Sequence, residues 1–253
     1  MQSRENDPYN RSQAPSATSD RDQVVQSLGG VIESSPPREG FLTGSFVWMF
    51  VGVLLSAISA VFVMNNADLM ETVQQYWFLL LIGQLGLVLV ISFAITRISS
   101  AVALGLFFVY ALTMGLTLGV IVTYYVGTIG ASGVVSAFAG AAAIFGGAAL
   151  YGVVTKRDLT SLGGILFMGL LGMIVVMFLQ IFFFADSSTA SLLIGIGGVV
   201  IFTGLTAWDV QRLKNGAMPN INKDSATVLG ALALYLDFVN LFLFMLRIFG
   251  SSR

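Results

Sequence analysis

The chain has 253 residues, of which 56% are hydrophobic and only 10% are charged. Soluble domains carry roughly 25% charged residues, so this composition indicates a membrane protein. A net charge of −1 gives no sign of nucleic-acid binding, and the lack of cysteine and histidine excludes disulfides, thiolate nucleophiles, zinc–thiolate sites and imidazole bases. Any response to pH near neutrality must therefore come from a carboxylate.

Residues 1–40 differ from the rest of the chain, because they are rich in Ser, Gln, Asn and Pro and carry mixed charges. Such a segment cannot bury enough apolar surface to fold, so we predict a disordered cytoplasmic tail. It lacks the short cationic region and apolar core of a cleavable signal peptide, so the first apolar helix is expected to act as an uncleaved anchor. The predicted domains are this tail and a transmembrane domain, 41–253.

Seven apolar stretches follow, each close to the roughly 20 residues that cross a bilayer as a helix. Their connections are short, so consecutive helices should be antiparallel neighbours in an all-α bundle. The predicted spans are 45–64, 76–96, 101–124, 133–154, 162–184, 191–211 and 226–248.

Basic residues in the loops predict the orientation of the bundle. Those between the spans all fall in the second, fourth and sixth loops, which are therefore expected on the cytoplasmic side. They are Arg97, Lys156, Arg157, Arg212, Lys214 and Lys223. Seven spans place the C-terminus outside, where Arg247 mildly opposes the rule. A last helix that crosses incompletely would remove this conflict, but we predict seven full spans.

Two acidic residues lie inside predicted spans, where a carboxylate costs several kcal/mol unless it faces the bundle interior and is paired. Asp209 precedes Arg212 by three residues, so it lies about one turn from the cytoplasmic end of its span. Asp237 lies deeper in the last span, and a short loop joins the two helices, so their carboxyl groups can approach. The two groups cannot both be ionised at low cost and should titrate as a unit.

A shared proton, a divalent cation or an arginine could relieve this repulsion. Arg97 is the candidate arginine, because it ends the second predicted span on the same side as Asp209. Asn240, one turn after Asp237, could supply a further oxygen. Calcium takes six to eight oxygen ligands, so the aspartates would bind it only transiently. Plainer roles stay open: Arg97 could snorkel to the interface, and Asp209 could be satisfied by Arg212 and water.

Two segments resemble the signature of the transmembrane Bax inhibitor motif family, also called the Bax inhibitor-1 family. They are GLTAWDVQRLK, residues 204–214, and LYLDFVNLFLFMLRIFG, residues 234–250. The segments FFVYALTMGLTLGV, 107–120, and KRDLTSLGGILFMGLLG, 156–172, support the resemblance in the order that the family shows. It covers roughly residues 40–250, and the compact chain with its generic tail is typical of a bacterial member.

The resemblance implies a seven-helix fold with a central last helix and a pH-sensitive calcium leak; animal and plant members are cytoprotective. The family's paired aspartates match Asp209 and Asp237, and the arginine that latches them when they are ionised matches Arg97. Protonation would loosen or tighten this latch and so gate the path. Some members also carry an acid inside the second helix, where this chain offers only Gln84, so cation attraction could be weaker.

The sequence therefore predicts a calcium leak channel or cation pathway with a di-aspartyl pH sensor, in a protein that is not an enzyme. Its expected partners are membrane lipids, calcium or protons and other membrane proteins, without nucleic acid, and no cofactor is expected beyond transient calcium. The expected location is the bacterial inner membrane. Alternatively, the protein regulates a membrane protease or a stress factor without conducting ions. An intramembrane aspartic protease is disfavoured, because a YD/GxGD-like arrangement is missing.

Overall fold

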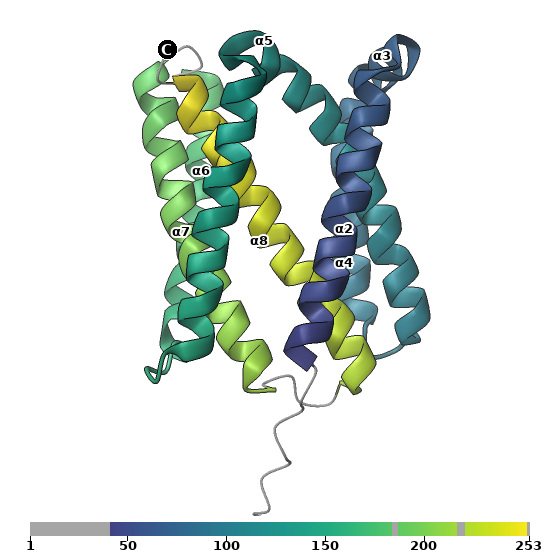
Figure 1. Cartoon of the computed structure of the whole chain (residues 1–253), viewed down its shortest axis with the longest axis vertical. Coiled ribbons are helices and arrows are strands. Elements are labelled where there is room, and N and C mark those ends of the chain that lie inside the picture. Colours follow the sequence, from purple (N-terminus) through teal and green to yellow (C-terminus); the bar gives the residue numbers. More distant parts are fainter. Residues whose placement is uncertain (1–40, 184–186, 217–220, 252–253) are drawn as a thin grey trace, which may run out of the picture. The chain divides into compact units, whose positions relative to one another are not determined.

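The computed structural model describes residues 41–183, 187–216 and 221–251. The predicted tail, 1–40, lies outside these residues. Every regular element within the described ranges is a helix, and six helices are long and apolar enough to cross a membrane (Figure 1). The protein is therefore an all-α, multi-pass membrane protein, as predicted.

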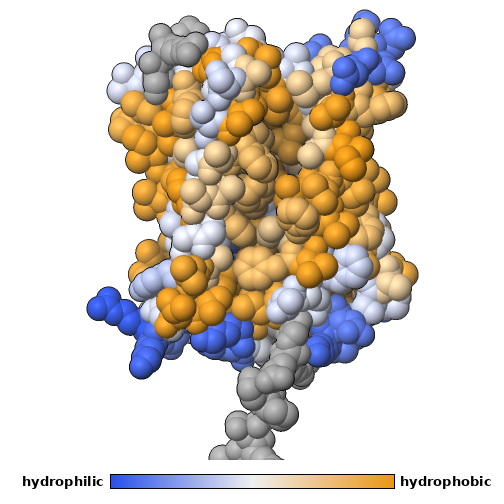
Figure 2. Space-filling model, viewed as in Figure 1, coloured by the Kyte–Doolittle hydropathy of each residue, from blue (hydrophilic) through white to orange (hydrophobic). Residues whose placement is uncertain are grey.

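Seven helices make up the described part of the chain. They are α2 (Phe41–Met64), α3 (Ala67–Gln75), α4 (Trp77–Ala94), α5 (Ser100–Val154), α6 (Thr160–Phe183), α7 (Ser188–Lys214) and α8 (Lys223–Ser251). In Figure 2, hydrophobic residues cover the sides of the visible face, and hydrophilic residues gather toward its two ends. This distribution is the one expected of a bundle whose sides contact lipid.

Helix α5 contains two membrane crossings. Its 55 residues would span about 80 Å, whereas the hydrocarbon core is about 30 Å thick. Gly130 interrupts the helix with φ 77° and ψ 165°, a conformation essentially restricted to glycine, and α5 bends back at one end of the bundle (Figure 1). The two halves correspond to the predicted spans 101–124 and 133–154, so the chain has the expected seven crossing segments.

The loop expected between the first two spans contains the short helix α3. Asn66 caps this helix, because its side-chain oxygen accepts a hydrogen bond from the Leu69 amide at 3.0 Å. The acidic Asp68 in the first turn is favourable at a helix N-terminus. Val73 is buried against the bundle, so α3 packs on one side and faces solvent on the other.

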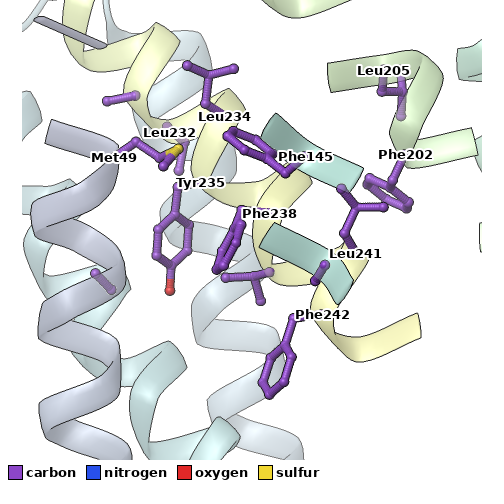
Figure 3. Close-up of a cluster of buried hydrophobic side chains, with 14 of the residues drawn as sticks. Met49, Phe145, Phe202, Leu205, Leu232, Leu234, Tyr235, Phe238, Leu241 and Phe242 are labelled. Atoms are coloured by element: carbon purple, nitrogen blue, oxygen red, sulfur yellow. The ribbon is translucent and has the colours of Figure 1, made fainter. Parts of the chain in front are cut away.

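Helix α8 is the central helix, as predicted. It packs against α2, α5 and α7, and 67% of its most apolar stretch is buried, compared with 39% or less in the other crossing helices. Aromatic side chains fill the space between α8 and α5. The rings of Phe145 and Phe238 meet edge to face with centroids 5.6 Å apart, and Figure 3 shows them side by side.

A polar contact fixes α8 against α2 and α5. The Ser56 hydroxyl lies 2.7 Å from the Ala111 carbonyl, to which it donates, and 2.6 Å from the Tyr235 hydroxyl. The Tyr235 ring is fully buried and meets the rings of Phe107 and Tyr110 edge to face. Side chains two positions apart on a helix point about 200° apart, so the side of α8 that carries residue 237 faces away from this contact.

Helix α7 lies close to the opposite side of α8. Gly198 makes this approach possible, because a Cβ at this position would collide with the ring of Phe244. Near its other end, α7 also packs against the second half of α5, where a Cβ on Gly152 would collide with the carbonyl oxygen of Ala207. These contacts set the position of α7 and of the acid that it carries.

Candidate functional site

The two intramembrane aspartates lie together inside the bundle. Asp209 on α7 and Asp237 on α8 have exposed fractions of only 9% and 4%. They act on each other electrostatically although the chain separates them by 28 residues. The close packing of α7 on α8 therefore produces the carboxylate pair that the sequence predicted.

Thr206 completes the immediate surroundings of Asp237. It lies three residues before Asp209 on α7, and its side chain meets the Asp237 carboxyl group. The Thr206 hydroxyl lies 2.7 Å from the Phe202 carbonyl, to which it donates. The same hydroxyl can instead turn its proton toward an ionised Asp237 carboxylate, which would accept it.

One oxygen of the pair is left without a partner. Asp237 Oδ2 is buried and makes no hydrogen bond. Leaving a buried polar atom unsatisfied costs about 1–3 kcal/mol, and more for a charged group. The site is therefore one that a proton or a cation would stabilise.

Arg212, and not Arg97, is the arginine whose charge acts on the aspartate pair in the structure. Arg212 lies one turn beyond Asp209 on α7, where its charge acts on that carboxyl group and its guanidinium carbon lies 5.3 Å from the centroid of the Trp208 ring. Arg97 is exposed in the connection between α4 and α5, and α4 packs against α3 and α5. Among the described residues, Arg97 is not one of the groups that act on either aspartate.

A cavity of about 970 Å³ opens beside the aspartate pair. Its wall is formed by α6, α7, α8 and the segment of α5 around residues 120–125. Helix α8 contributes one continuous stripe from Ala233 to Arg247, about 21 Å long at 1.5 Å per residue. Most of the lining is apolar, and its charged and amide groups are Asp209, Asp237, Asn240 and Arg247.

Calcium would find few fixed ligands in this wall. Asn240 donates its amide to the Leu236 carbonyl at 2.8 Å, so its side-chain oxygen is the atom that could face a cation. Over the described ranges, no cluster of three or more Asp, Glu, His or Cys side chains could hold a metal ion. Two carboxylates and one amide oxygen supply fewer than the six to eight oxygens that calcium takes.

The match to known proteins agrees with the fold. A family model described as "Inhibitor of apoptosis-promoting Bax1" matches residues 38–253. The chain belongs to this Bax inhibitor-1 family. The family resemblance inferred from the motifs around Asp209 and Asp237 is confirmed, with a match that covers all seven crossing segments.

Several bacterial relatives are similar over most of their length. The "Inner membrane protein YbhL" of Escherichia coli strain K12 is 38% identical over 240 residues, which are 92% of this chain and 97% of that protein. An uncharacterized protein of Deinococcus radiodurans is 39% identical over 216 residues, 84% of this chain and 90% of that protein. One of Borreliella burgdorferi is 39% identical over 225 residues, 85% and 94% of the two chains.

Gln84 does not contribute to the cavity wall of this Bax inhibitor-1 family protein. Its amide donates to the Thr117 hydroxyl at 2.7 Å and to the Thr113 carbonyl at 3.0 Å. Both partners belong to α5, so Gln84 joins α4 to α5. Gln84 therefore serves a helix–helix contact.

Gln211 is a buried site residue that the sequence analysis did not single out. Its side-chain oxygen accepts a hydrogen bond from the Leu159 amide at 2.8 Å, and its amide donates to the Arg157 carbonyl at 2.7 Å. These bonds attach α7 to the connection between α5 and α6, two residues beyond Asp209. A glutamine next to the charged end of a span carries no signal that separates this role from simple exposure.

Arg247 closes the other end of the cavity wall. It donates from Nε to the Ser191 hydroxyl at 3.0 Å, and from a terminal nitrogen to the side-chain oxygen of Gln180. Arg247 therefore joins α8 to α6 and α7. Arg247 follows Asp237 by 10 residues, so the two residues are about 15 Å apart along the axis of α8.

Proposed function

We propose that this Bax inhibitor-1 family protein is a pH-sensitive calcium leak channel or cation pathway, in which Asp209 and Asp237 sense protons. The observation that carries the proposal is the buried carboxylate pair in the wall of a 970 Å³ cavity, with Asp237 Oδ2 left unpartnered. Such a pair attracts a cation when it is ionised and loses that attraction when it is protonated. One site could therefore both sense pH and bind the passing ion.

The proposed location is a bacterial inner membrane, with the N-terminus on the cytoplasmic side. The 38% identity to an inner membrane protein of Escherichia coli supports the compartment. The basic residues of the second, fourth and sixth loops support the orientation, because such residues are retained on the cytoplasmic side. The aspartate pair then lies nearer to the cytoplasmic end.

The protonated and the ionised forms of the aspartate pair differ in whether they need a positive charge nearby. When Asp237 is protonated, its repulsion from Asp209 is removed. When both acids are ionised, the buried charge needs a calcium ion or a guanidinium group. We assign this second role to Arg97, as a latch.

Latching requires the end of α4 to move toward α7. Helix α4 is suited to this movement, because its main contacts among the described helices are with α3 and α5. Only 11% of its most apolar stretch is buried, compared with 67% in α8. Displacing α4 therefore removes little apolar surface from the bundle core.

Calcium entry into liposomes tests the proposal. Purified protein is reconstituted around a trapped calcium indicator, and protein-free liposomes are the control. The channel account expects calcium entry above the control, at a rate that differs between about pH 6 and about pH 8 because the pair changes protonation. A protein that only regulates other membrane proteins would give no entry at either pH, and that result would refute conduction.

A further inference from the structure

We propose that the cavity beside the aspartate pair binds lipophilic organic cations, such as an ammonium or phosphonium ion with an aromatic body. Cavities of about 300–1,000 Å³ are typical of small-molecule sites, and this one measures about 970 Å³. The inference concerns equilibrium binding. It does not depend on whether the site conducts calcium.

The wall suits the apolar part of such a ligand. Helix α6 contributes Leu170, Met173 and Met177, which are flexible or branched apolar side chains. Helix α7 adds the aromatic rings of Phe202 and Trp208. Aromatic faces attract organic cations through the ring quadrupole, and methionine adapts to irregular shapes, so the wall favours a bulky cation with aromatic groups.

The acidic groups of the wall lie at one end. Asp237 is 96% buried, points one unpartnered oxygen into its surroundings, and lies beside Asp209. Arg247 lies at the other end, where it is held by Gln180 and Ser191. A large cation can therefore place its charge beside the aspartates and its apolar body in the middle of the cavity.

Arg212 does not line the cavity at the aspartate end, where the charge of the ligand would lie. Although its charge acts on Asp209, Arg212 is not part of the cavity wall and lies instead beside a separate pocket with Gln211 and Asn215. Helix α6, which forms one side of the cavity, carries no titratable residue. The attraction for a cation at this end of the cavity is thus left to the two acids.

The helix arrangement gives a lipophilic ion a route to the cavity. Within the described ranges, α6 packs extensively against α7 alone, and only 6% of its most apolar stretch is buried. The cavity therefore has lipid on the far side of a single, weakly packed helix. A cation that dissolves in the bilayer could enter beside α6 without passing an aqueous mouth.

Tetraphenylphosphonium and tetraphenylborate provide the test, because they share a shape and differ in the sign of charge. Their binding to the full-length protein is measured by equilibrium dialysis in lipid nanodiscs, with protein-free nanodiscs subtracted. We expect saturable binding of the phosphonium, about tenfold weaker binding to Asp237→Asn, and no comparable binding of the borate. Asp224→Asn removes one exposed acid from the start of the same helix and should keep the wild-type affinity.

A second variant keeps the test valid if Asp237→Asn fails to fold. Ala233→Phe adds a ring to the cavity wall without changing the charge, and it should also weaken phosphonium binding about tenfold. Gel filtration and thermal unfolding establish that each variant is folded. The inference is overturned if both ions bind equally well, or if Ala233→Phe binds the phosphonium as the wild type does. Calcium flux is measured without either ion, so neither result decides the channel proposal.

Discussion

Tyr235 and Asp237 lie on opposite sides of α8: Tyr235 anchors the helix in the bundle, and Asp237 contributes to the cavity wall. The Tyr235 side of α8 is fastened to α2 and α5 through Ser56, inside a cluster of edge-to-face aromatic rings. The Asp237 side faces α7 and the cavity. Because the first side is rigidly packed, the carboxyl group on the other side is presented at a fixed depth.

The hydroxyl contact between Tyr235 and Ser56 should make a measurable contribution to stability. Tyr235→Phe removes this contact but leaves Ser56 bonded to the Ala111 carbonyl, so the free energy of unfolding should fall by about 0.5–1.5 kcal/mol. Unfolding in detergent monitors the change, with Tyr76→Phe as control because Tyr76 is 49% exposed. Equal stability of Tyr235→Phe and wild type would contradict this role.

Helix α5 shows what the sequence could predict for an element and where it failed. Apolar length correctly indicated two crossings, but it predicted a loop between residues 124 and 133. The structure continues the helix on both sides of Gly130, because one residue with positive φ is enough to reverse the direction. Hydropathy reports which residues are apolar, and it contains no information on how tightly a chain turns. Helix α3 was missed because it is short and largely polar, so it does not appear as an apolar span.

Substitution of Gly130 tests the turn. Gly130→Ala places a Cβ at φ 77°, so it should destabilise the protein by about 1–3 kcal/mol. Gly127→Ala is the matched control, because Gly127 is helical and a Cβ there meets nothing within 4 Å. Thermal unfolding of the two variants compares them directly. If both variants unfold at the same temperature, the positive φ at Gly130 does not require glycine, and the prediction is wrong.

At the scale of the whole molecule, the sequence predicted the aspartate pair but not its surroundings. A short loop between two helices was enough to bring Asp209 and Asp237 together. The position of Arg97 depends on the order of the helices around α8, which loop charges do not specify. Thr206 was missed because a threonine in an apolar span carries no sign of its contacts.

Movement of α4 is the prediction that concerns the bundle as a whole. The chain has no cysteine, so spin labels at Thr96→Cys and Asn215→Cys, both exposed, would be confined to the ends of α4 and α7. If Arg97 latches the ionised pair, the distance between labels should be shorter at about pH 8 than at about pH 6. In Asp237→Asn the distance should change less with pH than in the wild type. Identical distances in the wild type at both pH values would argue against the latch.

The most direct test of the proton-sensing pair is the pH dependence of calcium entry in Asp237→Asn. The asparagine mimics the protonated acid at one of the two positions, so calcium entry should change less between about pH 6 and about pH 8 than in the wild type, and should lie close to the wild-type rate at the lower pH. Asp224→Asn, with the same loss of one charge outside the cavity, should keep the wild-type response. An Asp237→Asn protein that retains the full wild-type pH response would contradict the account.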